Sequence, residues 1–231
     1  MPRRTRMYIA GLPYHVVQRG NNRQACFFDD DDRRLYLELL VSSLRRYDAL
    51  LHAFVLMTNH VHLLMTPRAE DSISRVMRVA GSCYAQRFNR KYARTGSLWE
   101  GRHKASVIEA DAYLLCCYRY IEMNPVRAGM VTSPDAYRWS SYRANACGGS
   151  LSALDPHPTY AALGSTPAVR QAAYRALFAA ADTGADDQSI RRATSACVPL
   201  GDEAFSARVA RQAGQALAYP RRGRPARRCI G

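Results

Sequence analysis

The chain has 231 residues, about half of them apolar, which is enough for one sizeable domain with an appendage or for two small domains. It has no apolar run of about 18 residues, so we expect no membrane-spanning helix, and its basic N-terminus lacks the apolar stretch of a secretory signal. The formal net charge of +14 favours a nucleic-acid partner, and seven cysteines without a C-x-x-C pair favour reduced thiols in the cytoplasm.

Periodic patterns predict most of the secondary structure of the first 109 residues. Alternation predicts strands, whereas apolar residues three and four apart predict helices. An acidic cluster before a helical pattern suits a helix N-terminus. In chain order we expect a strand at 14–19, a helix from about 29 to 47, strands at 50–57 and 60–66, a helix at 72–92 and an extended segment at 97–109.

A further helix is predicted from Asp111 to Asn124, ending before Pro125. The order β-α-β-β-α-β-α is that of an α+β, ferredoxin-like (RRM-like) fold with an antiparallel sheet. Such a sheet has helices on one face and can leave the other face free for a ligand. We expect this domain to span 1–147 and a helical C-terminal extension with a basic tail to span 148–231, because the sequence Cys-Gly-Gly-Ser at 147–150 is typical of a linker.

His60 and His62 are separated by one residue in a predicted strand, so both imidazoles project from one face. Val61 and Leu63 face the core side. Two imidazoles suit a divalent metal, but a site needs at least a third ligand. Two incidental histidines remain the simpler interpretation of this spacing taken alone.

Tyr120 and Asn124 are four residues apart, so they lie on one face of the predicted helix. Asn124 offers an oxygen ligand and Tyr120 a phenol that can act as a nucleophile. Tyr113 and Tyr118 are rivals on the same helix, but only Tyr120 has an asparagine four residues later. A core role for any one of the 14 tyrosines remains open.

Several longer stretches resemble the single-tyrosine HUH transposases, specifically the REP-associated tyrosine transposases. They are V-V-Q-R-G-N-N-R, M-T-N-H-V-H, G-S-L-W-E-G-R-H-K, Y-I-E-M-N-P-V-R-A-G-M-V and W-S-S-Y, within about residues 5–145. The resemblance implies that Tyr120 is the catalytic tyrosine and that His60, His62 and Asn124 are metal ligands. The resemblance is weaker after residue 150, where such proteins vary, and it implies little about the tail.

The reaction implied by this resemblance is nicking and joining of single-stranded DNA through a 5′-phosphotyrosine, with Mg²⁺ or Mn²⁺ polarising the scissile phosphate. The substrate would be a short, REP-like hairpin with a flanking single strand. We expect such a protein to act in the bacterial cytoplasm, on the nucleoid, as a monomer or a homodimer.

Basic and amide side chains in four places are the predicted DNA contacts. The tail Arg-Gly-Arg-Pro at 222–225 is similar to the core of an AT-hook, although a basic tail that binds any phosphate is an alternative. The predicted contacts are Arg19, Asn21, Asn22, Arg23, Arg102, Lys104, Arg127, Arg222 and Arg224.

Two other functions fit parts of the sequence. A metal-dependent phosphoesterase would use the histidine pair with water as the nucleophile and would not need Tyr120. A domesticated hairpin-binding protein would keep the basic surface without cutting DNA. Locating the tyrosine in a covalent DNA adduct distinguishes all three.

Overall fold

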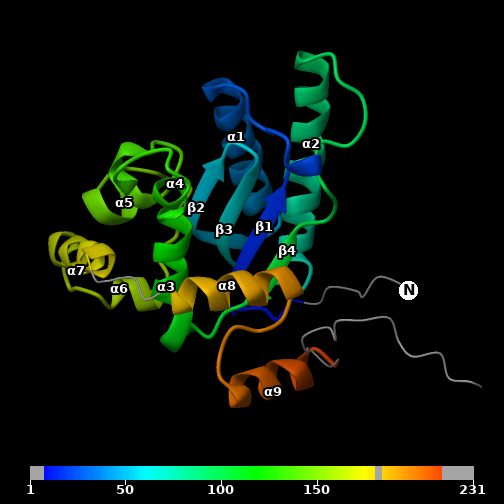
Figure 1. The fold of residues 1–231 in the computed structure, drawn as a ribbon. Helices are drawn as coiled ribbons and strands as arrows, with labels where there is room; N and C mark the ends of the chain where they lie inside the picture. The colour runs from blue at the N-terminus through cyan, green and yellow to red at the C-terminus, as the bar shows by residue number, and fades with distance from the viewer. Residues whose placement is uncertain (1–7, 180–183, 215–231) are drawn as a thin grey trace, which may run out of the picture.

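The computed structural model describes residues 8–179 and 184–214 and contains a four-stranded sheet between two layers of helices (Figure 1). Neighbouring strands are antiparallel, in the order β2-β3-β1-β4. This order confirms the predicted α+β, ferredoxin-like arrangement. The strands are β1 (Tyr14–Arg19), β2 (Ala49–Met57), β3 (His60–Pro67) and β4 (Lys104–Val107).

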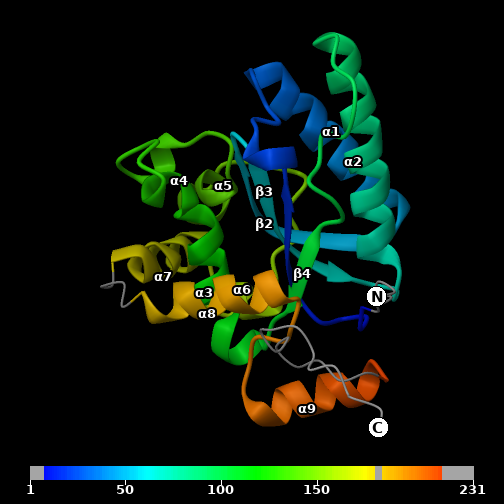
Figure 2. The ribbon, with the colours of Figure 1, turned by 45° about the vertical axis from the view of Figure 1, so that its right-hand side comes forward.

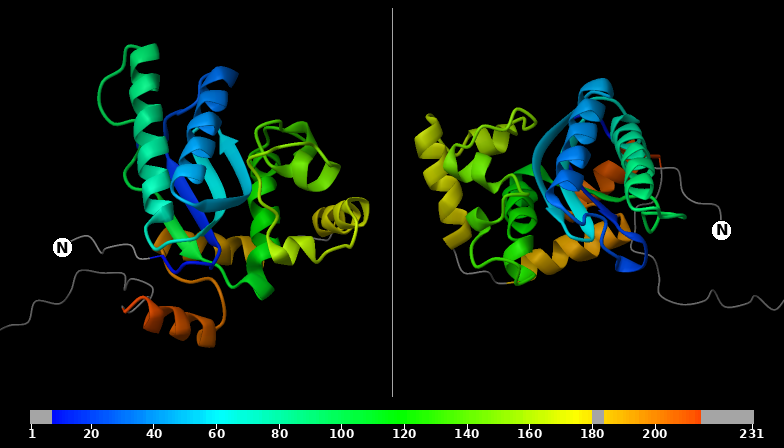
Figure 3. Two further views of the ribbon diagram at one scale, coloured as in Figure 1. Left: turned by 180° about the vertical axis from the view of Figure 1, so that it is seen from behind. Right: turned by 90° about the horizontal axis from the view of Figure 1, so that it is seen from above.

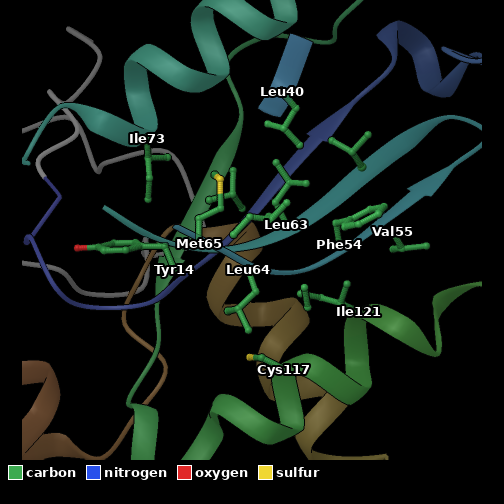
Figure 4. Packing of buried hydrophobic residues seen from close by; sticks show 14 of the residues in the cluster. Tyr14, Leu40, Phe54, Val55, Leu63, Leu64, Met65, Ile73, Cys117 and Ile121 are labelled. Atoms are coloured by element: carbon green, nitrogen blue, oxygen red, sulfur yellow. The ribbon is translucent and has the colours of Figure 1, made fainter. Parts of the chain in front are cut away.

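Helices α1 (Asp30–Arg46) and α2 (Ser72–Lys91) cover one face of the sheet (Figure 3). A capping box starts α1, because the Asp32 N–H donates to Asp29 Oδ1 over 2.9 Å and the Asp29 N–H donates back to Asp32. The predicted acidic start of this helix is therefore confirmed. Apolar side chains of both helices, Leu40 and Ile73 among them, point toward the sheet (Figure 4).

From the sequence we expected that the other sheet face could be free for a ligand. In the structure it is covered, because two helices lie on it. Helix α3 (Ala110–Glu122) packs Cys117 and Ile121 toward Leu64 of β3 (Figure 4). Helix α8 (Ala185–Ala196) lies across β4 (Figure 2). Burying the apolar stripe of α3 requires a partner surface, and the even-numbered positions of β3 provide it.

Two predicted boundaries differ from the structure. Only the end of the expected extended segment 97–109 is a strand, which is β4. The helix that carries Tyr120 ends at Glu122, and a short helix α4 (Asn124–Arg127) follows it. Pro125 starts α4 instead of merely ending α3, because a residue in the first helical turn needs no N–H donor.

The rest of the described chain is helical, as expected for the extension. The segment after α8 also pairs with the sheet edge: the Leu200 N–H donates to Val107 O, and the Glu109 N–H donates to Leu200 O, both over 2.8 Å. No described helix is long and apolar enough to cross a membrane. The remaining elements are the 3₁₀ turns η1 (Asn21–Arg23) and η2 (Pro134–Ala136), and the helices α5 (Tyr142–Cys147), α6 (Pro158–Ala161), α7 (Pro167–Ala179) and α9 (Glu203–Gln212).

The end of α5 coincides with the predicted domain boundary after residue 147. Gly148 follows with a φ of 75°, the left-handed conformation that often ends a helix. The division of the chain into domains at this point stays a prediction, because α6 and α7 pack beside α3 and α8 returns to the sheet (Figure 1).

A buried carboxyl group joins α3 to α5 and α7. Glu122 is fully buried and accepts hydrogen bonds from Ser141 Oγ (2.5 Å), Asn145 Nδ2 (2.9 Å) and Tyr174 Oη (2.7 Å). Burial raises the pKa of Glu122 from 4.5 to about 7, and the three hydrogen bonds oppose that shift. The second serine of W-S-S-Y, Ser141, is therefore in direct contact with the glutamate of Y-I-E-M-N, Glu122.

We expect Glu122 to make the folded state less stable as pH rises from about 4.5 to 7. In this window the folded protein holds a proton that the unfolded chain releases, so the free energy of unfolding falls by about 3 kcal/mol, an order-of-magnitude value. Denaturant unfolding of Glu122→Gln between pH 5 and 8 should lack this loss.

The matched control is Glu38→Gln, which removes an exposed carboxylate from α1. Buried histidines give the opposite slope, because their lowered pKa values add stability as pH rises toward 6.5. The difference between variant and wild type isolates Glu122. Equal pH dependence in wild type and Glu122→Gln would show that another group is responsible.

Candidate active site

Three histidines gather on the sheet face that α3 and α8 cover. In the antiparallel register His62 lies opposite Val17 and His60 lies opposite Arg19. Cross-strand partners share a face, so His15, two residues before Val17, projects to the same side. The ring centroids of His60 and His62 are 4.9 Å apart, and those of His15 and His62 are 5.0 Å apart.

Each of the two candidate metal-binding imidazoles uses Nδ1 for a hydrogen bond within the protein. His62 Nδ1 lies 2.8 Å from His15 Nε2, and His60 Nδ1 lies 2.6 Å from Asn59 Oδ1. His15 Nδ1 in turn lies 2.8 Å from Thr194 Oγ1 of α8. The Nε2 atoms of His60 and His62 are therefore the nitrogens left for a ligand.

Burial keeps these imidazoles neutral at physiological pH. It lowers the pKa of His60 to about 4 and of His15 to about 3, and it holds the pKa of His62 well below 6.5. Neighbouring positive charges, such as that of Arg19, lower the pKa of His60 and His62 further. A neutral imidazole has the lone pair that a metal requires.

Tyr120 of α3 lies against the same cluster. Its ring centroid is 5.7 Å from that of His62 and 5.5 Å from that of His15, both edge-on, and the residue is only 5% exposed. Burial raises the pKa of Tyr120, whereas a hydrogen bond from Arg191 and the charges of Arg191 and Arg127 lower it. The Tyr120 ring thus contacts the histidines, and the positive charges of Arg191 and Arg127 favour the ionised form of its phenol.

Arg127 and Arg191 approach Tyr120 from different elements. The Arg127 guanidinium lies 4.6 Å from the Tyr120 ring centroid, donates to the Tyr120 carbonyl and pairs with Asp187 of α8 at 2.9 Å. The Arg191 guanidinium, on α8, lies 5.9 Å from the same centroid. Arg127 therefore braces the tyrosine, and the DNA contact that the sequence predicts for it stays a prediction.

Asn124 is tied to the end of α3 by its amide nitrogen. Asn124 Nδ2 donates to the carbonyls of Tyr120 (2.8 Å) and Ile121 (3.2 Å). A carbonyl only accepts, so this pattern fixes which amide atom is nitrogen and leaves Oδ1 as the atom that can bind a ligand. Asn124 thus keeps the oxygen that a divalent metal would use.

The donor set fits a divalent metal only if an amide oxygen takes part. Among the residues that the structure describes, no group of three or more His, Cys, Asp or Glu side chains could hold a metal ion. Two neutral imidazoles and the Asn124 oxygen suit Mg²⁺ or Mn²⁺ when water and phosphate oxygens complete the shell. Their chemistry is compatible with the metal that the sequence led us to expect.

A basic cleft of about 560 Å³ opens beside these residues. Cations from β1, η1, β4, α8 and the loop before β4 face it, and Glu100 is its one acidic side chain among the lining residues. It is lined by His15, Val17, Arg19, Arg23, His62, Glu100, Gly101, Arg102, Lys104, Tyr120, Arg191, Thr194 and Ser195.

The structure brings together only part of the predicted DNA contacts. Four of them, Arg19, Arg23, Arg102 and Lys104, line the cleft. Asn21 and Asn22 lie in η1 next to Arg23 but do not line it. Arg222 and Arg224 lie outside the described residues.

Three residues that contact the site were not predicted from the sequence: His15, Arg191 and Thr194. His15 could have been found from the sequence. It is four residues before Arg19 in the same strand, so both side chains point to one face, and pairing with the strand of His60 and His62 makes this the histidine face. Arg191 and Thr194 gave no such signal, because they belong to a helix that reaches the site from the far end of the chain.

Comparison with known proteins places the sheet and the helices up to α3 in one family. Residues 8–124 match the family described as IS200-like transposases. A solved structure described as a REP-associated tyrosine transposase bound to a REP hairpin is 19% identical, with a TM-score of 0.54, over 68% of this chain and 99% of that chain. At 19% identity, the similarity to this solved structure shows a shared fold alone.

A crystal structure from Deinococcus radiodurans R1, provisionally described as a transposase, is 20% identical over 51% of this chain and 95% of that chain, with a TM-score of 0.36. A search of curated proteins gave no significant match.

Proposed function

Because the chain belongs to the IS200-like transposase family, we propose that it nicks and rejoins single-stranded DNA through a covalent bond between Tyr120 and a 5′-phosphate. The observation that carries this proposal is the position of Tyr120 against His62 in a cleft lined by five cations. A phosphodiesterase that used only water would not need a tyrosine there.

In the proposed step the Tyr120 oxygen attacks phosphorus, and the bond from phosphorus to the 3′-oxygen breaks. The phenol loses one proton and the leaving 3′-oxygen gains one, so no net proton is consumed. One phosphodiester replaces another, which lets a 3′-hydroxyl reverse the step and join DNA without a nucleotide cofactor. The charges of Arg191 and Arg127 favour the ionised phenol.

His60, His62 and Asn124 would hold the metal, Mg²⁺ or Mn²⁺. When bound, it would polarise the scissile phosphate and stabilise the charge that develops on it. The hydrogen bonds at the two Nδ1 atoms hold both imidazoles in place. The Nδ2 bonds of Asn124 hold its oxygen at the end of α3.

We propose hairpin DNA with a flanking single strand as the substrate. The structural relative with the REP hairpin supports this choice, as does the cleft. Arg19, Arg23, Arg102 and Lys104 would contact phosphates, which position a strand without reading its sequence. The proposal includes action on the bacterial nucleoid, as a monomer or a homodimer.

The proposal is tested by incubating the protein with a labelled hairpin oligonucleotide and Mg²⁺ or Mn²⁺. A DNA–protein adduct that survives denaturing electrophoresis is expected, with the label on Tyr120 after proteolysis. Tight binding without any adduct or cut strand would favour a domesticated hairpin-binding protein instead.

We expect Arg191→Gln to slow adduct formation about 10- to 100-fold. The reason is that a cation near the attacking oxygen and the phosphate stabilises charge that develops in the transition state. The measurement is the single-turnover rate of adduct formation at saturating DNA.

The matched control is Arg192→Gln, which removes the same charge from the next position of α8 and does not alter the cleft lining. Its rate should stay within about twofold of wild type, the range of ordinary surface changes. Equal slowing in both variants would mean that α8 acts only through its overall charge.

A further inference from the structure

We propose that His15 and Thr194 form a hydrogen-bond relay that allows His62 to carry its proton on Nδ1 with every buried N–H paired, so that His62 Nε2 can bind the metal. His15 is thus a positioning residue that acts through His62. The inference rests on the proposed metal site and adds to it two residues from opposite ends of the described chain.

The contacts of His15 are those of a relay and leave it no other polar role. His15 Nε2 lies 2.8 Å from His62 Nδ1, and His15 Nδ1 lies 2.8 Å from Thr194 Oγ1. All three residues are buried, with exposures of 1% for His15 and 5% for both His62 and Thr194. These low exposures favour hydrogen bonds within the protein for their polar atoms, although all three residues line the cleft.

The two nitrogens at 2.8 Å share one proton, which leaves two arrangements. In the first, His62 Nδ1–H donates to His15 Nε2, and His15 carries its own proton on Nδ1. In the second, His15 Nε2–H donates to His62 Nδ1, and His62 must carry its proton on Nε2. Only the first arrangement leaves the His62 Nε2 lone pair open to a metal.

Thr194 decides whether the first arrangement is fully hydrogen-bonded. The His15 Nδ1–H then needs an acceptor in a buried site, and the Thr194 hydroxyl oxygen lies at 2.8 Å from that nitrogen. Without it the arrangement that permits metal binding would leave a buried N–H unpaired. Outer partners of this kind orient metal-binding histidines and commonly change metal affinity 10- to 100-fold.

Packing alone could also hold His15 in place, because its ring stacks on that of His62 with an interplanar angle of 9°. The substitution His15→Phe keeps an aromatic ring at this position and removes both hydrogen bonds. His15→Gln keeps an acceptor that can reach His62 Nδ1. A packing role and a relay role therefore predict opposite results for this pair.

The experiment is a titration with Mn²⁺ alone, in which electron paramagnetic resonance reports the free ion. We expect His15→Phe to weaken Mn²⁺ binding about 10- to 100-fold and His15→Gln to restore at least part of it. Thr194→Val should weaken binding, whereas Thr194→Ser, which keeps the hydroxyl, should resemble wild type. The Thr194 pair still tests the relay if a change at His15 prevents folding.

His62→Ala makes the failure of the relay distinguishable from the failure of the metal site. Unchanged Mn²⁺ binding in His62→Ala, or none in wild type, would overturn the proposed metal site. Lost binding in His62→Ala together with wild-type binding in both His15→Phe and Thr194→Val would overturn only the relay.

A second readout needs no activity. Long-range ¹H–¹⁵N correlation spectra identify the protonated nitrogen of each histidine. In the Mg²⁺-saturated protein we expect His62 and His15 both to carry the proton on Nδ1. A proton on His62 Nε2 in that state contradicts the relay.

Discussion

Tyr120→Phe is expected to abolish the covalent DNA–protein adduct and to lower strand cleavage by at least roughly a thousandfold, since removing a nucleophile removes the pathway that it opens. The change deletes one oxygen and keeps the ring that packs against His15 and His62. Folding and hairpin binding should therefore stay close to wild type. The measurements are adduct formation by denaturing electrophoresis and binding by fluorescence anisotropy.

Tyr118→Phe and Tyr113→Phe are the matched controls on the same helix. Tyr118 is buried between the rings of Tyr160 and Tyr174, with centroids 5.7 and 5.9 Å away. The ring of Tyr118 can keep this packing without its hydroxyl group. We therefore expect Tyr118→Phe to form the adduct, and Tyr113→Phe as well. If Tyr120→Phe forms it too, the nucleophile has been assigned to the wrong residue.

His60→Ala and His62→Ala should each reduce cleavage at least about a hundredfold, because a metal contributes several kcal/mol to stabilising charge on a phosphoryl group. Chelation of the metal in the wild-type protein should have the same effect. Hairpin binding should largely survive in both cases, since the cleft keeps its arginines and lysine. Cleavage and binding are measured on the same oligonucleotide.

His157→Ala serves as the control for the loss of a histidine. His157 caps α6, away from the cleft lining, and should leave cleavage unchanged. Circular dichroism checks that every variant is folded. Full cleavage in excess chelator would exclude the metal role, and a joint loss of binding and folding would make the strand histidines structural.

The sequence predicted the sheet because its signals are local. Alternation over 14–19 and 60–66, apolar spacing in the helices and an acidic helix start each act within a few residues, and together they leave few topologies. The same logic placed His60 and His62 on one strand face, and spacing paired Tyr120 with Asn124. His60, His62 and Tyr120 lie together at one sheet face in the structure, Asn124 follows at the end of α3, and the roles of all four stay predictions.

What the sequence did not predict depends on contacts between distant segments. The amphipathic pattern of α8 indicates a helix but not the surface that it covers, so Arg191 and Thr194 gave no sign of lying at the site. The internal bracing of Arg127 was missed for the same reason, because Asp187 is its partner. Pro125 was interpreted as the end of a helix, but a proline can also stand at the start of one, and in the structure it lies in the first turn of α4.

The late position of α8 in the chain has a consequence for protein synthesis. The ribosome makes the sheet, Tyr120 and both strand histidines first, and it adds α8 only after the whole of α4 to α7. At a rate of 5–20 residues per second, this interval lasts roughly several seconds. During that time a nascent chain carries Tyr120, His60 and His62, while Arg191 and Thr194 have not yet been translated.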